Sequence, residues 1–582
     1  MGLICYFVLV MSPAYYIKIY KIPCLTLLSL SCFSLTWANI DKTLIESSIL
    51  INLNVFSKSD STSNAGGRRL SAAASTSIQQ SVDANHTSLP EITALTDSLT
   101  NTFNSFQNEN LLEAAEHAIN YITDNKTSFN LNDSDILAGI KSILIAYIKT
   151  QSSNEETLLN SIPELTSIVL SNIIPSKVNR WNGSMPIWSM GLSKVLMESI
   201  SDSGAVQNPN TLQSSVAKST ISSLLKILDE STITAPGFTP GISLIDTSRA
   251  ISNQGMLFGG TENFMRLHPE KTRFLEFASK GLADGLFVDN TNPLSVQLIQ
   301  EFSNLLGEAT IESCIQFTSS LEGDNSIFTY EALKAISTGL TLGAVYKSSS
   351  SVSYRESALP ETTAELISNS ISSQAITSTL ELNGDFELNR IAESTASGSA
   401  MGAQLASILD QALDYKDGWE LYSRNAIAKA TSKGSANGSI NAASKKIEND
   451  LNIEDTLAKT TRQEVLDVAN GSALGSLMGT TGLAFYYPTM MQSIINHAAQ
   501  GATFGGVTAT NLALVEKPEG TTEEFEIEIS RAISHGSATG ALFQIVSLIE
   551  DSMPDKRSFD TLTIETAEAV SFGSTYGGFV PE

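Results

Sequence analysis

The sequence predicts an all-α protein, built as an array of about ten or more antiparallel helices in an α-solenoid or a layered helical bundle. Three observations predict this fold. Gly-x-x-x-Gly pairs recur about every 32 residues, the segments around them have helical periodicity, and proline-containing connections separate the segments. Each repeat is therefore expected to be one helix of about 22–25 residues followed by a short connection.

The glycine pairs are too frequent to be accidental. With 37 glycines in 582 residues, random placement gives about two such pairs, whereas the repeat alone supplies nine, from residue 255 onward. Two double-length gaps each contain a degenerate copy, at residues 305–309 and 368–371. We predict that the paired glycines are helix-packing positions: Gly255, Gly259, Gly281, Gly285, Gly339, Gly343, Gly398, Gly402, Gly434, Gly438, Gly471, Gly475, Gly501, Gly505, Gly536, Gly540, Gly573 and Gly577.

A glycine inside a helix needs a compensating contact, because it costs about 1 kcal/mol relative to alanine. Small residues four apart supply such a contact by letting two helix backbones approach closely. Serine follows the first glycine in five pairs, and we expect its hydroxyl to hydrogen-bond to a carbonyl one turn earlier or on the next helix. Lipid-embedded helices use the same motif, but charges such as Asp467 and Arg531 inside these helices favour packing in water.

Residues 1–38 resemble a signal peptide. Lys18 and Lys21 precede an apolar run at Cys24–Leu35, and Thr36-Trp37-Ala38 offers small residues for cleavage. Met11 is an alternative start that would give a lead of ordinary length, and an uncleaved anchor is the alternative to export. The predicted location is secreted, or the cell surface or periplasm.

The rest of the chain divides by composition into three parts. Residues 39–105 are rich in serine and are predicted to form a flexible tether. Residues 106–180 begin the helical periodicity and form an N-terminal helical segment, and residues 181–582 form the helical repeat array. No stretch after residue 38 has 18 consecutive apolar residues, so we expect no membrane partner once the signal is removed.

The charge balance restricts the partners. The chain has 35 Lys and Arg against 61 Asp and Glu, a formal net charge of −26. A field of this sign repels phosphate backbones, so no nucleic-acid partner is expected. Self-association or binding to a cell-surface component remains open.

Motifs for catalysis, cofactors and metals are missing. The sequence contains no phosphate-binding loop, dinucleotide fingerprint, nucleophile elbow or zinc-protease motif, so we assign no catalytic, cofactor-binding or metal residue and expect no cofactor. Cys314 is the one cysteine after the leader, and we interpret it as a buried structural residue. The segments Ser320–Glu331 and Glu381–Glu387 resemble parts of calcium loops, but both lack a full ligand set.

These observations favour a secreted, acidic helical-repeat protein that acts as a structural, scaffold or surface-interaction protein rather than as an enzyme. A membrane-active or lipid-handling helical protein is one alternative. An enzyme or ligand binder whose site has no recognisable motif is the other.

Overall fold

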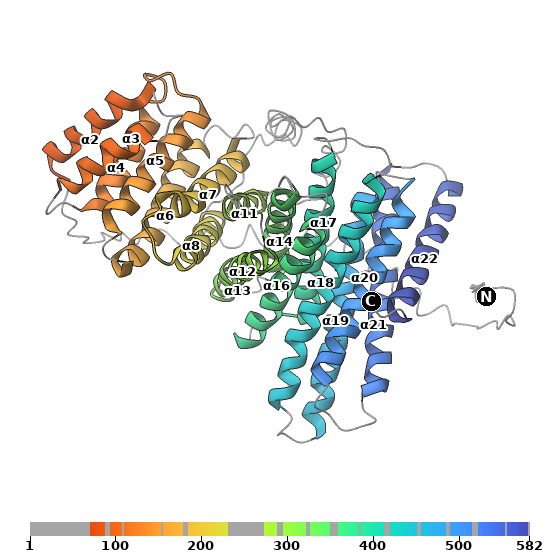
Figure 1. The fold of residues 1–582 in the computed structure, drawn as a ribbon. Coiled ribbons are helices and arrows are strands. Elements are labelled where there is room, and N and C mark those ends of the chain that lie inside the picture. Colours follow the sequence, from red (N-terminus) through yellow and green to blue (C-terminus); the bar gives the residue numbers. More distant parts are fainter. Residues whose placement is uncertain are drawn as a thin grey trace, which may run out of the picture. The chain divides into compact units, whose positions relative to one another are not determined.

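The computed structural model describes helices and short connections in residues 70–87, 93–106, 110–152, 155–178, 184–230, 273–287, 295–321, 326–349, 359–382, 386–411, 419–450, 455–484, 489–514, 522–552 and 556–579. All regular secondary structure in these ranges is helical, which confirms the predicted all-α class (Figure 1). The helices are α2 (Ala72–Asn85), α3 (Thr93–Asn104), α4 (Leu111–Asp124), α5 (Asp133–Gln151), α6 (Glu155–Val178), α7 (Ser184–Ser203), α8 (Pro209–Glu230), α11 (Arg273–Leu286), α12 (Val296–Leu306), the π-helix η3 (Gly307–Ile311), α13 (Glu312–Ser319), α14 (Ser326–Ser349), α16 (Leu359–Glu381), α17 (Leu388–Gln411), α18 (Trp419–Asp450), α19 (Asp455–Ala484), α20 (Met491–Leu514), α21 (Thr522–Ser552) and α22 (Lys556–Phe579).

The described helices alternate between two layers, and from α5 onward the long helices pack most extensively on a neighbour in the same layer. One layer contains, in order, α3, α5, α7, α11, α14, α17, α19 and α21. The other contains α2, α4, α6, α8, the stretch α12–η3–α13, α16, α18, α20 and α22. Consecutive helices touch across the layers and run antiparallel: the Gln404 amide, late in α17, donates to the Arg424 carbonyl, early in α18. The predicted layered helical array is confirmed.

Helix lengths differ from the expected 22–25 residues in part of the array. Helices α14, α17, α20 and α22 have 24 residues each. In contrast, α18, α19 and α21 have 32, 30 and 31 residues. Their ends extend through polar segments without proline, where no residue terminates the helix until the next connection.

The flexible tether predicted for residues 39–105 is wrong in its second half. Residues 72–85 and 93–104 form helices α2 and α3, which bury Ile78 and Leu99 completely. Apolar residues four apart give both segments a buried face, which the average composition of the region conceals. Residues 39–69 and the proposed signal peptide at 1–38 lie outside the described residues.

Packing continues across the proposed boundary between residues 180 and 181, since α6 contacts both α7 and α8. Residues 69–582 form one compact unit. The degenerate repeat at residues 305–309 falls where a π-helical turn, η3, interrupts the stretch from Val296 to Ser319. Such turns insert one extra residue into an α-helix.

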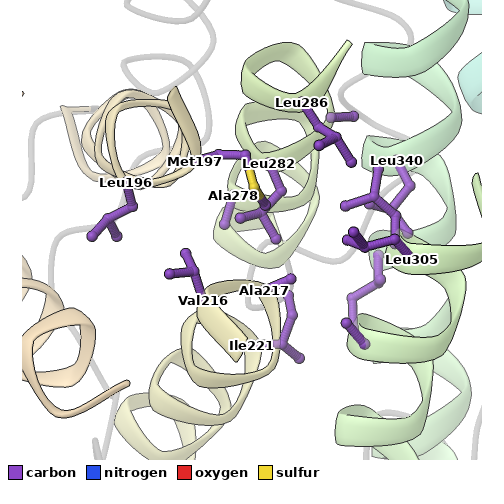
Figure 2. Packing of buried hydrophobic residues seen from close by; sticks show 14 of the residues in the cluster. Leu196, Met197, Val216, Ala217, Ile221, Ala278, Leu282, Leu286, Leu305 and Leu340 are labelled. Carbon is purple, nitrogen blue, oxygen red and sulfur yellow. The ribbon is translucent and has the colours of Figure 1, made fainter. Parts of the chain in front are cut away.

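Large apolar side chains fill the space between the layers around α7, α8 and α11. Figure 2 shows Leu196 and Met197 of α7, Val216 and Ile221 of α8 and Leu282 of α11 converging there. Toward α18–α22 the buried apolar residues are more often alanine, with Ala428, Ala498, Ala499 and Ala541 in one cluster. Among the described helices, none combines the length and hydropathy that a membrane-spanning segment needs.

Candidate functional site: glycine contacts between parallel helices

Every described glycine pair lies against the main chain of an earlier helix in the same layer. At Gly475 of α19, for example, an added Cβ atom would overlap the carbonyl oxygen of Glu393 in α17. The partner helices are α7 for Gly281 and Gly285, α11 for Gly339 and Gly343, α14 for Gly398 and Gly402, α16 for Gly434 and Gly438, α17 for Gly471 and Gly475, α18 for Gly501 and Gly505, α19 for Gly536 and Gly540, and α20 for Gly573 and Gly577. Gly255 and Gly259 lie outside the described residues.

The contacts define the direction and register of each helix pair. Gly471 faces Asn389, and Gly475 faces Glu393, so four residues along α19 correspond to four residues along α17. The two helices are therefore parallel. The sequence spacing predicts that glycines face a neighbouring helix but not which one, and the partner proves to be two elements away in the chain.

These contacts leave no room for a methyl group. A Cβ atom on Gly343 would lie 2.7 Å from the Lys280 carbonyl oxygen, and one on Gly285 would lie 2.8 Å from that of Lys194. Both separations are shorter than a carbon–oxygen van der Waals contact, and the atom that would have to move is backbone. At this approach a glycine Cα–H group can also donate a weak hydrogen bond to the facing carbonyl.

Two further glycines make comparable contacts. Gly479 extends the α19 row by four residues and faces Ser397 of α17. Its spacing from Gly475 is the signal that would have identified it. Gly307, in η3, faces Ser370 of α16, so here the glycine packs on a later helix rather than an earlier one.

The serines that follow the glycines do not form the expected hydrogen-bonded ladder. Within the described chain, their hydroxyls are buried and have no hydrogen-bond partner. A helical serine competes for a carbonyl that already accepts from a backbone N–H, and at these positions the hydroxyl does not take it. Ser439, four residues after one of them, does donate to the Ser435 carbonyl at 2.7 Å. The unpartnered serines are Ser399, Ser435, Ser472, Ser537 and Ser574.

Long polar side chains flank the glycine contacts. We call the residues one and five positions before the first glycine of a pair, and those continuing the same four-residue spacing, the contact row of a helix. In α18, the contact-row Lys433 forms an ion pair with Glu365 of α16 at 3.2 Å and lies over the Phe504 ring of α20, 5.0 Å from its centroid. In α19, the Asn470 amide donates to the Ala532 carbonyl of α21 at 3.1 Å. Contact-row side chains therefore link neighbouring helices within a layer.

Charged side chains are partly buried between α14 and α17. Burial raises the pKa of Glu393, against the opposing effects of Arg390 and Lys334. Burial also lowers the pKa of Lys334, although Glu393, Glu331 and other acids favour its charged form. Arg390 contacts the Glu393 carboxylate at 3.0 Å. These charges partly compensate one another inside the array.

An open groove with a volume of about 490 Å³ lies between α19 and α21. An ion pair between Arg462 and Glu528 at 2.8 Å joins the two helices beside it, and Asn470 lies 3.0 Å from His535 Nδ1. Its lining provides no hydroxyl or thiol nucleophile beside the histidine. The groove can hold a polar or mixed-charge group, and its lining consists of Gln463, Leu466, Asp467, Asn470, Glu528, Arg531, Ala532 and His535.

The remaining candidates for chemistry are the Cys314 thiol and the acidic groups that could bind a metal ion. Cys314 is buried, and burial raises the pKa of its thiol to about 12, so the reactive thiolate is suppressed. Within the described ranges, no three His, Cys, Asp or Glu side chains are grouped to hold a metal ion. Residues 322–325 and 383–385, in the two calcium-like segments, lie outside those ranges.

Comparisons with known proteins give little further guidance. No family model matches the chain, and no curated protein is similar to it. Among solved structures, a match is a "Circular tandem repeat protein with novel repeat topology and enhanced subunit contact surfaces". It is 10% identical, the match covers 87% of this chain and 96% of that chain, and the TM-score is 0.24. A likeness at that TM-score carries no conclusion about this protein.

Proposed function

We propose that this protein is a structural or scaffold protein whose working part is the helical array itself. The observation that carries the proposal is the series of backbone contacts at the glycine pairs from α11 to α22. Each contact fixes one helix against another in a single register, and repetition of such contacts builds an extended surface. Such a surface suits binding to a large partner rather than conversion of a small substrate.

We further propose that the array acts outside the cell, as a secreted or surface-located scaffold. The basic and apolar leader in residues 1–38 supports export. The net charge of −26 suits a hydrated surface. N-terminal sequencing of the exported protein should give a start at or near Asn39. Recovery of an intact leader in the membrane fraction would contradict cleavage.

Neighbouring glycines near the end of α22 provide a matched test of the packing role. A Cβ atom on Gly577 would overlap the Gln500 carbonyl, whereas one on Gly578 would meet only a Thr503 methyl at 3.8 Å. Gly577→Ala should destabilise by about 1–3 kcal/mol. Gly578→Ala should be neutral or stabilise by up to about 1 kcal/mol, because alanine is the better helix former. Chemical unfolding measures both, and equal effects would remove the packing role.

Scaffold function is tested by retention on the surface of cells that export the protein. Labelled full-length chain should be retained by these cells, and a Gly540→Leu variant, in which α21 is displaced from α19, should be retained less. Equal retention of both proteins would show that the intact array is not what binds.

A further inference from the structure

Contact rows in the interior of the array are covered by the next helix of the same layer. In α20, Asn496 and Gln500 lie five residues and one residue before Gly501, and their carbonyls face Gly573 and Gly577 of α22. Both residues are half-buried. The same positions in α11, α14 and α18 also face glycines of a following helix. A contact row is therefore where this fold receives a further helix.

The last two helices have contact rows that nothing in the described chain covers. Counting from Gly536, the row of α21 contains Ile527, Arg531, His535 and Thr539, and all four are exposed. Counting from Gly573, the row of α22 contains Ile564, Glu568, Phe572 and Tyr576, which are also exposed. We call these two rows, together with Phe543 one step further along α21, the C-terminal end face.

The C-terminal end face concentrates exposed apolar side chains. Phe572 is 64% exposed, Ile564 58%, Phe543 55%, Ile527 48% and Tyr576 46%. The other large apolar residues exposed in the described chain, Val296, Ile327 and Leu382, are scattered over α12, α14 and the end of α16. A cluster of this kind on a folded surface marks a binding site.

The opposite end of the array is different. In α2 and α3 the exposed positions are polar or small, including Thr76, Gln80, Asp83, Asp97 and Asn101. A polar outer face is how a terminal repeat is capped against water. The described part of the N-terminal end therefore offers no apolar surface against which the C-terminal end face of another copy would pack.

We propose that the C-terminal end face is a dimerisation surface on which two copies pack about a two-fold axis, with α21 of one copy over α22 of the other. This inference rests on the proposed scaffold function and names its first partner, a second copy of the chain. An isologous dimer buries the same apolar side chains twice and leaves the polar N-terminal ends free.

The chemistry of the rows fits a second copy better than a further glycine-bearing helix. Interior contact rows of the described helices are mostly polar and contain no aromatic residue at the positions that face a glycine, as at Lys280, Glu393 and Gln500. In contrast, the α22 row carries Phe572 and Tyr576, whose rings stack at 6.2 Å between centroids. Aromatic residues of this kind are the usual anchors of protein interfaces.

Size and charge also suit a dimer. Helix α22 has 24 residues and is thus about 36 Å long; two helices side by side present roughly 700 Å² per copy, close to the typical 800 Å² of a stable interface. Arg531 on α21 and Glu568 on α22 give the two rows opposite charges, which meet when the rows are exchanged between copies. Because each chain carries −26, salt should strengthen the association by screening repulsion elsewhere.

The mass of the full-length chain in solution tests the proposal. Sedimentation at micromolar concentrations should give a dimer, and Phe572→Glu with Tyr576→Glu should weaken association by about 30-fold or more. Both side chains are exposed, so helicity and the melting profile should survive. Val296→Glu is the matched control, because Val296 is 56% exposed on α12, and it should remain a dimer. A wild-type monomer at all concentrations, or a double variant that still dimerises, would overturn the proposal.

A charge exchange tests the arrangement of the two copies. Arg531→Glu and Glu568→Arg should each weaken the dimer, and the double exchange should restore it. Loss without restoration would refute the pairing of α21 with α22. If removal of residues 1–68 converts a monomer into a dimer, then this N-terminal segment covers the C-terminal end face in the full-length chain, and the proposal fails. If the chain is monomeric but is still retained on cells, only the dimer proposal is overturned. If the Gly540→Leu variant is retained as well as the wild-type chain, only the scaffold proposal is overturned.

Discussion

The N-terminal helices α2–α8 and the C-terminal helices α14–α22 form the same two layers but use different types of residue in their packing. The first region packs large side chains, and Ile78, Leu99, Ile122 and Tyr147 are buried almost completely. The second region packs glycine against main chain, with alanine and serine around the contacts. The transition falls near α7, where Gly191 meets the Leu137 side chain, whereas Gly281 of α11 meets the Met190 backbone. The two regions should therefore tolerate opposite kinds of substitution.

Enlarging a C-terminal glycine should have the largest effect. In Gly540→Leu the new side chain meets the Leu474 carbonyl, and α21 must separate from α19. We expect a loss of more than about 3 kcal/mol, at or above the upper end of ordinary overpacking. Hydrogen exchange should accelerate in α19 and α21 while α2–α6 stay protected, because repeat arrays transmit damage mainly to neighbours. Unchanged exchange in α19 would contradict the contact.

Shortening a buried side chain in the N-terminal region should destabilise the protein less. The cause is also opposite, because the substitution leaves a cavity instead of overfilling a contact. Ile122 of α4 is fully buried, so Ile122→Val removes one methylene group and leaves a small cavity. The expected loss is about 0.5–1.5 kcal/mol by chemical unfolding. Ile327→Val, at a position 56% exposed on α14 and outside the C-terminal end face, is the control and should change stability by less than about 0.5 kcal/mol. Equal losses at both positions would erase the contrast between a buried core and an exposed face.

The sequence predicted the helical class and the array because both depend on local periodicity and on glycine spacing. It did not predict which helices are partners, since Gly475 and Glu393 are brought together by the alternation of layers rather than by any local pattern. The tether was assigned from composition, yet Leu95 and Leu99, four residues apart, are enough to bury one face of α3. The C-terminal end face had no local signal either, because Phe572 resembles a core residue in the sequence, and only the structure shows that no described helix covers it.

The buried serine hydroxyls beside the glycines offer a test of whether the C-terminal contacts leave polar groups without hydrogen bonds. Ser472 in α19 is buried without a hydrogen-bond partner in the described chain, so Ser472→Ala should stabilise by about 0.5–1 kcal/mol. Ser439 in α18 is equally buried but donates to a carbonyl, so Ser439→Ala should be close to neutral. Thermal unfolding of the pair measures the difference. Destabilisation by Ser472→Ala would reveal a bound water or partner at that hydroxyl.

The smallest expected effect concerns the buried charge between α14 and α17. Burial raises the pKa of Glu393 in the folded chain, so the folded state binds this proton more tightly than the unfolded state. Stability from this group therefore rises as pH falls from the raised pKa toward the unfolded value of about 4.3, and the penalty is fully present at neutral pH. Glu393→Gln removes the charge while keeping the shape, so it should stabilise by less than about 1 kcal/mol at pH 7. The gain should shrink as the pH approaches 4.3.

Asp97→Asn, at an exposed position in α3, is the control and should show no comparable gain at pH 7. If Glu393→Gln destabilises at pH 7, the ion pair with Arg390 outweighs the cost of burial, and charged contacts contribute to the C-terminal packing alongside glycine.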